Sequence, residues 1–319
     1  MTNFSNTFGI TMRNFQRFPE QPNALELIEF GVKAEALGYD SLWVWDHILL
    51  GVDPHFPIID ALSLLTAIAA RTQKIKLGTG ILVLPVRNPV LLAKQLSSMD
   101  LISGGRLLMG MASGWYKREF DALGIPFNQR GKIMDQNLDI ITRLWQEDMV
   151  TAEIGPYNMR QSVMFPKPTK SGGPPILIGG YVDRVLKRAA VTGDGWLTYF
   201  YTPEGFTKSW TKVINFAEEA GKDPAGLLNC NQLPIMVGDS REEVETPMLE
   251  WLNTEWDFAS WSDSTVDSAI MGTVDDCVEQ LQAQIDVGVQ KLIFVPYKYE
   301  TEQVETIANE IIPRLRNSR

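Results

Sequence analysis

Hydrophobic and polar positions along this chain switch between a period typical of strands and a period typical of helices. Short runs rich in β-branched and aromatic residues predict strands at 8–12, 41–45, 75–84, 106–112, 175–179, 195–200, 231–238 and 291–296. Amphipathic stretches lie between them and predict helices at 24–37, 60–72, 89–102, 130–145, 183–191, 206–220, 241–252, 274–287 and 301–314. The chain therefore alternates strand and helix from one end to the other.

Eight strands, each followed by helix, predict an α/β fold, the (β/α)8 TIM barrel, as a single domain over residues 1–319. A doubly wound open sheet is the alternative, but its first turn carries phosphate-binding glycines. Here the first strand continues into TMRNFQRFPEQ, which contains no glycine. Because such a barrel needs about 250 residues, we expect insertions on its C-terminal face, at 149–170 and 253–271.

Composition narrows the kinds of partner. The formal net charge is −10, without a basic run, and such a field repels phosphate backbones, so we expect no nucleic-acid partner. The start lacks a signal-peptide pattern, and apolar runs end well before the roughly 18 residues of a membrane span. Cys230 and Cys277 suit buried thiols in a reducing compartment. We predict a cytoplasmic protein with no membrane contact and no metal site.

A histidine follows the second predicted strand, and the C-terminal ends of barrel strands are where function lies. His47 comes directly after Asp46, and a histidine near a carboxylate can move a proton near neutral pH. The alternative is a structural histidine that caps a loop. The chain's other histidine, His55, lies in the loop DPHFP, and we expect it to be structural.

Glycines at two other strand ends indicate close backbone approach. Thr79-Gly80 lies inside the third strand, where glycine often marks a bulge; tight packing of the barrel is the alternative. Gly179-Gly180-Tyr181 joins the fifth strand to the next helix. Backbone N–H groups freed of side chains there could approach a phosphate, although a pair of glycines is by itself a weak signal.

Arg130 begins a strongly periodic helix. A helix N-terminus with an arginine suits an anionic phosphate, because free amides and a fork of donors converge there. The commoner fate of an arginine is a surface ion pair, for which Glu119 and Asp135 are candidates.

Three tryptophans, Trp251, Trp256 and Trp261, fall in the acidic stretch 249–267. Aromatic residues in a long loop could line a substrate pocket or form a lid. A subunit contact explains them equally well.

Nearly the whole chain resembles the bacterial-luciferase-like flavin monooxygenases and deazaflavin-dependent reductases. The most specific stretch is LGTGILVLPVRNPVLLAKQLSSMDLISGGRLLMGMASGW, followed by EFDALGIPFNQRG. The pieces GYDSLWVWDH, PPILIGG and GTVDDCVEQLQAQIDVGVQKLIFVP support it in the same order.

The resemblance implies a role for each candidate. His47 matches the catalytic histidine beside the isoalloxazine ring, with Asp46 as its acidic neighbour. Thr79-Gly80 matches a bulge with a non-prolyl cis peptide against that ring, which predicts a cis bond between these two residues. The remaining matches concern the cofactor phosphate: Ser113, Gly114 and Arg130 at its binding site, and the loop Gly179, Gly180 and Tyr181 that supplies amides. Luciferase itself has an arginine at the position of Ser113, so this chain departs from the family there.

The function implied is a flavin-dependent oxidoreductase. We expect a monooxygenase that takes reduced FMN from a separate NAD(P)H:flavin reductase and uses O2 on a small organic substrate, as a homodimer or higher homo-oligomer. The alternative is a coenzyme F-420-dependent reductase or dehydrogenase. The chain mixes Lys with Arg and is not Ala-rich, which favours FMN, since the deazaflavin is common in actinobacteria with Arg- and Ala-rich proteins.

Two further hypotheses stand beside this one. A cofactor-free barrel, such as an aldolase or hydrolase, would need a strand-end lysine, paired carboxylates or several metal-ligating histidines, and this chain has two histidines. A non-catalytic flavin-binding barrel is the other; His47 and Thr79-Gly80 favour catalysis over it.

Overall fold

The computed structural model describes residues 4–52, 54–254 and 266–317. All eight predicted strands are present: β1 (Thr7–Met12), β2 (Ser41–Val44), β3 (Lys76–Val83), β4 (Leu107–Ala112), β7 (Ile176–Gly179), β8 (Gly195–Tyr199), β9 (Leu228–Val237) and β11 (Lys291–Pro296). The sheet order is β10-β9-β11-β1-β2-β3-β4-β7-β8, and a further pairing of β9 with β8 closes the ring. The predicted (β/α)8 barrel is confirmed.

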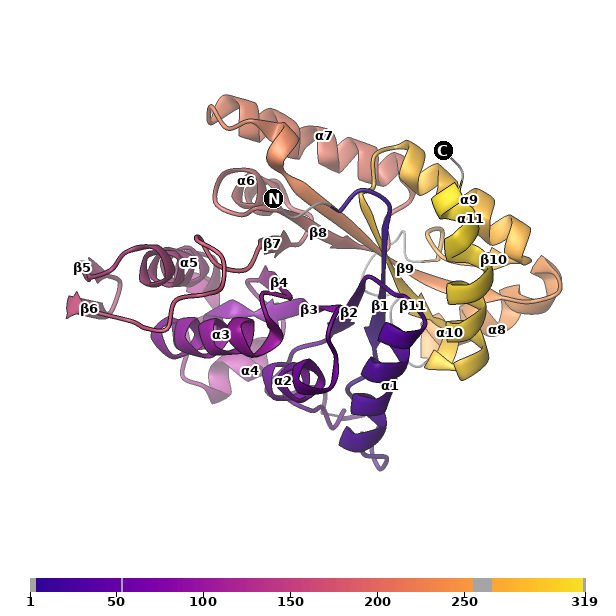
Figure 1. Ribbon diagram of the computed structural model, residues 1–319, viewed down its shortest axis with the longest axis horizontal. Helices are drawn as coiled ribbons and strands as arrows, with labels where there is room; N and C mark the ends of the chain where they lie inside the picture. Colours follow the sequence, from indigo (N-terminus) through magenta and orange to yellow (C-terminus); the bar gives the residue numbers. More distant parts are fainter. Residues whose placement is uncertain (1–3, 53, 255–265, 318–319) are drawn as a thin grey trace. The chain divides into compact units, whose positions relative to one another are not determined.

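Each predicted helical stretch contains a helix, and Figure 1 labels them along the chain. They are α1 (Ala24–Ala36), α2 (Ala61–Arg71), α3 (Pro89–Ser103), α5 (Arg130–Gln146), α6 (Asp183–Val191), α7 (Pro203–Glu219), α8 (Arg241–Thr254), α9 (Val274–Asp286), and α10 (Thr301–Thr306) with α11 (Ile312–Asn317). One short helix, α4 (Lys117–Ala122), was not predicted.

The two predicted insertions have different outcomes. The first contains an antiparallel hairpin of β5 (Val150–Ile154) and β6 (Tyr157–Ser162). Its placement on the C-terminal face was wrong, because it joins α5 to the start of β7 and therefore leads into the N-terminal end of a strand. The second lies partly outside the described residues, including Trp256 and Trp261, and ends in the short strand β10 (Ile270–Gly272) beside β9. Trp251 lies in α8, as the predicted helix 241–252 places it, and not in the loop with the other two tryptophans. It is buried, edge-to-face with Tyr297 at 5.4 Å between ring centroids.

The contacts between residues divide the chain into two compact units. Unit 1 comprises Met1–Arg13, Phe30–Trp43 and Leu177–Arg319, and unit 2 comprises Asn14–Glu29 and Val44–Ile176.

In unit 2, local signals in the sequence determine where helices begin and end. Asn88 caps α3 by accepting from two amides of its first turn, Pro89 occupies the first helical position, and Gly104 ends the helix at φ +66°. Arg106, just before β4, donates to the carbonyl oxygens of Ala69, Thr72, Ile75 and Ser103 at 2.6–3.0 Å. It thereby satisfies carbonyls that the end of α2 leaves without helical partners.

In unit 1, aromatic side chains fill the space between strands and helices. Phe8 of β1 stacks on Phe294 of β11 at 6.2 Å, and Trp196 of β8 stacks on Phe206 of α7 at 5.6 Å. Both cysteines of the chain lie here, buried and free, as the sequence predicts. Nowhere in the described ranges is a helix both long and apolar enough to traverse a bilayer.

Candidate active site

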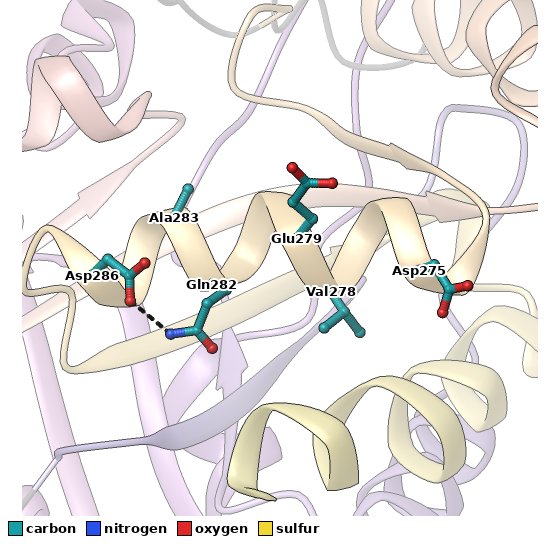
Figure 2. Close-up of a pocket in the computed structure, with 6 residues that line it drawn as sticks. All are labelled: Asp275, Val278, Glu279, Gln282, Ala283 and Asp286. Atoms are coloured by element: carbon teal, nitrogen blue, oxygen red, sulfur yellow. Dashed lines mark hydrogen bonds between the residues drawn. The ribbon is translucent and has the colours of Figure 1, made fainter. Parts of the chain in front are cut away.

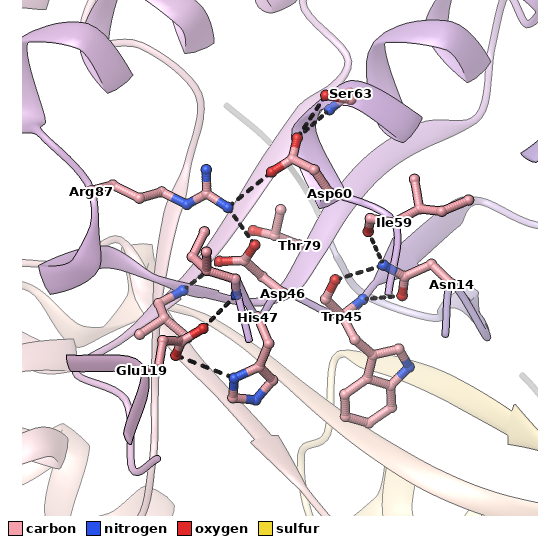
Figure 3. A network of polar contacts seen from close by, with 12 residues as sticks. Asn14, Trp45, Asp46, His47, Ile59, Asp60, Ser63, Thr79, Arg87 and Glu119 are labelled. Carbon is pink, nitrogen blue, oxygen red and sulfur yellow. Dashed lines mark hydrogen bonds and ion pairs between the residues drawn. The ribbon is translucent and has the colours of Figure 1, made fainter. Parts of the chain in front are cut away.

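The backbone at the end of β2 is held in place by a buried asparagine. Asn14 Nδ2 donates to Trp45 O at 2.9 Å and to Ile59 O at 2.8 Å, and Asn14 Oδ1 accepts from Trp45 N at 3.0 Å. Figure 3 shows the side-chain amide of Asn14 hydrogen-bonded to both backbone groups of Trp45, the residue before Asp46. The direction in which these two side chains leave the strand is thereby fixed.

Asp46 forms a buried ion pair. Its Oδ1 accepts from Arg87 Nη2 at 2.5 Å, and its Oδ2 accepts from Val83 N at 3.0 Å. The same guanidinium nitrogen donates to Asp60 Oδ2 at 3.1 Å. Burial lowers the pKa of Arg87, but the charges and hydrogen bonds of Asp46 and Asp60 outweigh burial and raise it. Arg87 therefore stays cationic and ties the end of β2 to the start of α2.

The carboxylate that meets His47 belongs to Glu119 of α4. Glu119 Oε2 lies 3.3 Å from His47 Nδ1, while Oε1 accepts from the amides of Ile48 and, at 3.2 Å, Leu49. Glu119 is 0% exposed. We therefore reassign the carboxylate partner of His47 from Asp46 to Glu119 (Figure 3). A catalytic role for Asp46 stays a prediction, with its carboxylate engaged by Arg87 and Val83.

The electrostatics of this pair favour a charged carboxylate. Burial pushes the pKa of Glu119 upward, but the hydrogen bond and charge of His47 and the two backbone amides outweigh it and hold the pKa below its ordinary value. The carboxylate of Glu119 in turn holds the imidazole of His47 in one orientation through the contact at Nδ1. The arrangement can present a histidine as a proton donor.

Aromatic rings surround the imidazole on the side of the β4–α4 loop. Trp115 and Tyr116 meet the His47 ring edge-on, with centroids at 5.8 and 6.3 Å. The His47 side chain keeps 13% of its surface exposed, so part of it remains reachable from solvent. His55, in contrast, is exposed and stacks on Phe18 at 4.2 Å.

The bulge in β3 is present, but its cis bond is one residue later than predicted. The register against β4 shifts between Thr79 and Leu82, and the non-proline cis peptide joins Gly80 to Ile81. The predicted Thr79-Gly80 bond is not the cis one. Thr79 still pairs in register with Met109, and its hydroxyl donates to Gly110 O at 2.8 Å. Because Thr79 is held in the ladder, the irregularity begins after it.

The structure brings together the predicted phosphate residues of unit 2. Arg130 Nε donates to Gly114 O at 3.1 Å and Nη1 to Phe127 O at 3.0 Å, with the guanidinium 4.0 Å above the Phe127 ring. Arg130 is therefore oriented by carbonyls and a ring, whereas Glu119, its suggested ion-pair partner, binds His47. The hydroxyl of Ser113, next to Gly114, has no hydrogen-bond partner among the described residues.

The predicted amide loop lies in unit 1. Gly179 ends β7, and Gly180 follows at φ +124°, with its carbonyl accepting from Trp196 Nε1 at 2.7 Å. Tyr181 is 50% exposed, and its ring lies 6.3 Å from that of Tyr199. Binding of a phosphate by this loop stays a prediction.

Sequence reasoning missed Glu119, Arg87 and Asn14 as members of the site. The position of Glu119, seven residues beyond the end of β4, is compatible with a place at the C-terminal end of the barrel. The sequence, however, suggests this glutamate only as an ion-pair partner for Arg130. Arg87 and Asn14 carried none, because neither residue type nor spacing marks them. Their roles depend on long-range contacts that only the fold creates.

A depression also follows the outer face of α9 in unit 1 (Figure 2). It is lined by Asp275, Val278, Glu279, Gln282, Ala283 and Asp286. Gln282 donates to Asp286 within the same helix at 2.7 Å, and Asp275 pairs with Arg314. The lining residues all belong to one helix and half of them are acidic, which is typical of a solvated helix face.

Comparison with known protein families shows which family this chain belongs to. A family model described as "Luciferase-like monooxygenase" matches residues 7–291. The chain belongs to this family. The luciferase-like resemblance seen in the sequence is thereby confirmed, and with it an oxidoreductase family.

Members of the luciferase-like family that are similar to this chain use different cofactors. The F420-dependent glucose-6-phosphate dehydrogenase of Amycolatopsis mediterranei (strain U-32) is 26% identical, covering 93% of this chain and 96% of that protein. Monooxygenase RslO1 from Streptomyces bottropensis superposes with a TM-score of 0.81 at 21% identity, over 97% of this chain and 99% of its own. The oxygenating constituent of 3,6-diketocamphane monooxygenase from the CAM plasmid of Pseudomonas putida, solved with FMN, gives 0.79 at 18% identity, over 98% and 99%. The family thus includes F420-dependent enzymes and FMN monooxygenases.

Proposed function

We propose that this chain is a flavin-dependent oxidoreductase in which His47 moves a proton to or from a small organic substrate. The observation that carries the proposal is the pair formed by His47 and the buried Glu119. Buried carboxylates are costly unless they are paired, and this one is aimed at the only histidine that follows a barrel strand. A buried carboxylate in this position suits a site whose histidine must keep one orientation.

The residues present fit an anionic, flavin-type cofactor. Ser113 offers a hydroxyl without a partner among described side chains, and Arg130 is held beside it through Gly114. A guanidinium and a hydroxyl are suitable donors for a phosphate. A reduced flavin or deazaflavin bound here would supply the reducing electrons for the reaction.

The protein's own part in the reaction is positioning and proton transfer. Glu119 lies at Nδ1 of His47 and holds the ring in place, which leaves Nε2 to exchange a proton with an oxygen of the substrate. The exposed part of the ring lets the proton return from solvent. Trp115 and Tyr116, whose rings meet the imidazole edge-on, lie against another part of it.

Two cofactors suit this site. Reduced FMN with O2, as in a monooxygenase, is supported by the description of the family model and by the balance of Lys and Arg; a separate NAD(P)H:flavin reductase would then serve a homodimeric enzyme. Coenzyme F-420, as in a reductase or dehydrogenase, is supported by the 26% identity to an F420-dependent dehydrogenase over 93% of this chain.

A cofactor titration tests the proposal. Wild type and Arg130→Ala are titrated with FMN, riboflavin and coenzyme F-420, reduced and without oxygen, with Arg118→Ala as the exposed arginine control. Arg130→Ala should weaken FMN by about 2 kcal/mol and leave riboflavin unchanged, because only FMN carries the phosphate. Equal weakening of both would mean that Arg130 does not hold the phosphate. A clear preference for coenzyme F-420 in binding and turnover would select the second cofactor, and no binding of any of the three would contradict the function.

A further inference from the structure

Two buried glutamines of unit 1, Gln284 and Gln232, differ in whether their side-chain amides form hydrogen bonds. Gln284 of α9 is 1% exposed and fully bonded: its Oε1 accepts from Asn231 Nδ2 at 3.1 Å, and its Nε2 donates to Tyr201 O at 2.9 Å. Gln232 of β9 is 0% exposed, and neither its Oε1 nor its Nε2 has a hydrogen-bond partner in the described parts of the chain. Buried amides without partners are rare, because each lost hydrogen bond destabilises the fold.

The amide of Gln232 points to the inner face of the strands. Its neighbour Asn231 reaches outward to Gln284 of helix α9, and successive side chains of a strand point to opposite faces. Inward-pointing residues of adjacent strands stack in layers. In register with Gln232 are Tyr199 of β8 on one side and Ile293 of β11 on the other.

The same inner face continues toward solvent through two tyrosines. Tyr199, in register with Gln232, lies against Tyr181 with ring centroids 6.3 Å apart, and Tyr181 is half exposed. Burial raises the pKa of Tyr199, and its hydrogen bond and charge interaction with Tyr181 add to the rise. Its phenol therefore stays protonated and can donate. Gln232, Tyr199 and Tyr181 thus form a wall that begins at a buried amide and ends at a half-exposed ring.

We propose that Gln232, with Tyr199, forms a subsite for a neutral ligand edge that carries an N–H beside a C=O, as in a lactam, imide or carboxamide. A glutamine amide offers one acceptor and one donor side by side, and such an edge returns both. The inference deepens the proposed function by naming a class of substrate, and it rests on that function only for the reaction, not for the binding.

Charged ligands suit this wall less well. Neither Gln232 nor Tyr199 carries a charge near neutral pH, and removing an ion from water is unfavourable unless a counter-charge meets it. Lys291, a cation on this inner face, lies one layer below in register with Cys230. Its Nζ already contacts Ser41 Oγ at 3.2 Å and the Phe4 ring at 4.9 Å. A neutral edge is the chemistry that matches.

The test compares Gln232→Met with Gln284→Met by thermal unfolding of the full chain without FMN. Methionine keeps an unbranched side chain of similar length and removes both polar atoms. Gln232→Met should raise Tm by about 2–4 °C, since an unpartnered amide is replaced by an apolar group. Gln284→Met should lower Tm, because it leaves Asn231 and the Tyr201 carbonyl without partners. Gln232→Leu repeats the first arm should methionine pack badly.

The ligand arm uses δ-valerolactam as the probe and N-methyl-δ-valerolactam as its control, which keeps the carbonyl but lacks the N–H. The lactam should raise Tm of the wild type and of Gln284→Met, with no shift in Gln232→Met and a smaller one from the N-methyl probe. A lower Tm for both Gln232 variants would overturn the inference, as would no lactam shift in the wild type or equal shifts from both probes. Because no cofactor is present, failure here leaves the FMN titration untouched, and the reverse also holds.

Discussion

Three donors converge on the buried carboxylate of Glu119: the ring of His47 and the amides of Ile48 and Leu49. One side chain on α4 thus fixes both the histidine and the loop that follows it. The contact spans 72 residues of sequence between His47 and Glu119. No local pattern links them, which is why the sequence predicts the histidine and misses its carboxylate.

His47→Ala tests whether the histidine acts in the chemical step. Turnover should fall by roughly 10²–10⁴, the usual contribution of one general acid or base. Cofactor affinity, measured by titration, should change much less, because the phosphate residues lie elsewhere. His55→Ala, an exposed histidine stacked on Phe18, is the matched control and should be nearly silent. Near-normal turnover in His47→Ala would show that the histidine is structural.

Glu119→Gln should lower the free energy of unfolding by about 1–3 kcal/mol at pH 7, because charged hydrogen bonds are lost. Since the pKa of folded Glu119 lies below its ordinary value of 4.5, its contribution is complete above that pH. It is lost as the pH falls through 4.5 to the lower folded-state value. In urea titrations the difference between wild type and variant should therefore shrink under acid.

Glu279→Gln is the control for that experiment, since Glu279 is an exposed glutamate on α9. It should leave the free energy of unfolding unchanged at every pH. A difference between wild type and Glu119→Gln that is equally large at pH 7 and well below pH 4 would contradict the ionised pair.

At the scale of elements, the β4–α4 loop depends on a glycine that sequence reasoning assigned to the cofactor. Gly114 has φ +77°, and a Cβ there would lie 2.6 Å from Val83 Cγ1 and 3.0 Å from the Phe120 ring. Val83 and Phe120 form a small core cluster with Val86. The loop that carries Trp115 therefore packs directly on β3, which requires glycine whether or not a cofactor binds.

Gly114→Ala can be separated into backbone and packing effects by comparison with Gly124→Ala. Gly124 has φ +69°, but no atom lies within 4 Å of the position that a Cβ would take. Its substitution should therefore lower the free energy of unfolding by about 1–2 kcal/mol, because alanine disfavours the left-handed backbone conformation. Gly114→Ala should lower the free energy of unfolding by a further 1–3 kcal/mol or so, because the added methyl group overpacks against Val83. Urea unfolding measures both, and equal costs would mean that the loop moves to accommodate the methyl group.

Elements are also where sequence patterns predict most accurately. Asp183–Val191 was predicted with the bounds that α6 has, because hydrophobic spacing and a following Thr-Gly pair define it. The cis bond was misplaced by one residue. The glycine in the strand indicated an irregularity, but only the register of Thr79 with Met109 determines where it begins.

At the scale of the whole molecule, counting strands was sufficient to predict a closed barrel, because few folds alternate eight strands with helices. The charge of the chain adds a constraint that the fold does not: at −10 overall, an anionic cofactor is repelled except near local cations. Arg130, held by the carbonyls of Gly114 and Phe127, is such a cation. Cofactor choice and substrate depend on side chains at this finer level, so the fold alone does not predict them.

Glu119 both contacts His47 and accepts from the backbone amides of the following loop, which has a consequence for how related genes diverge. Since two backbone amides also need this carboxylate, selection for a folded protein retains the glutamate even after selection for chemistry has lapsed. Among the described residues, the side chain of His47 bonds to no backbone group, so it has no such second use. Mutational drift should therefore remove His47 before Glu119. Lineages that carry the glutamate without the histidine would mark descendants that kept the architecture and abandoned the reaction.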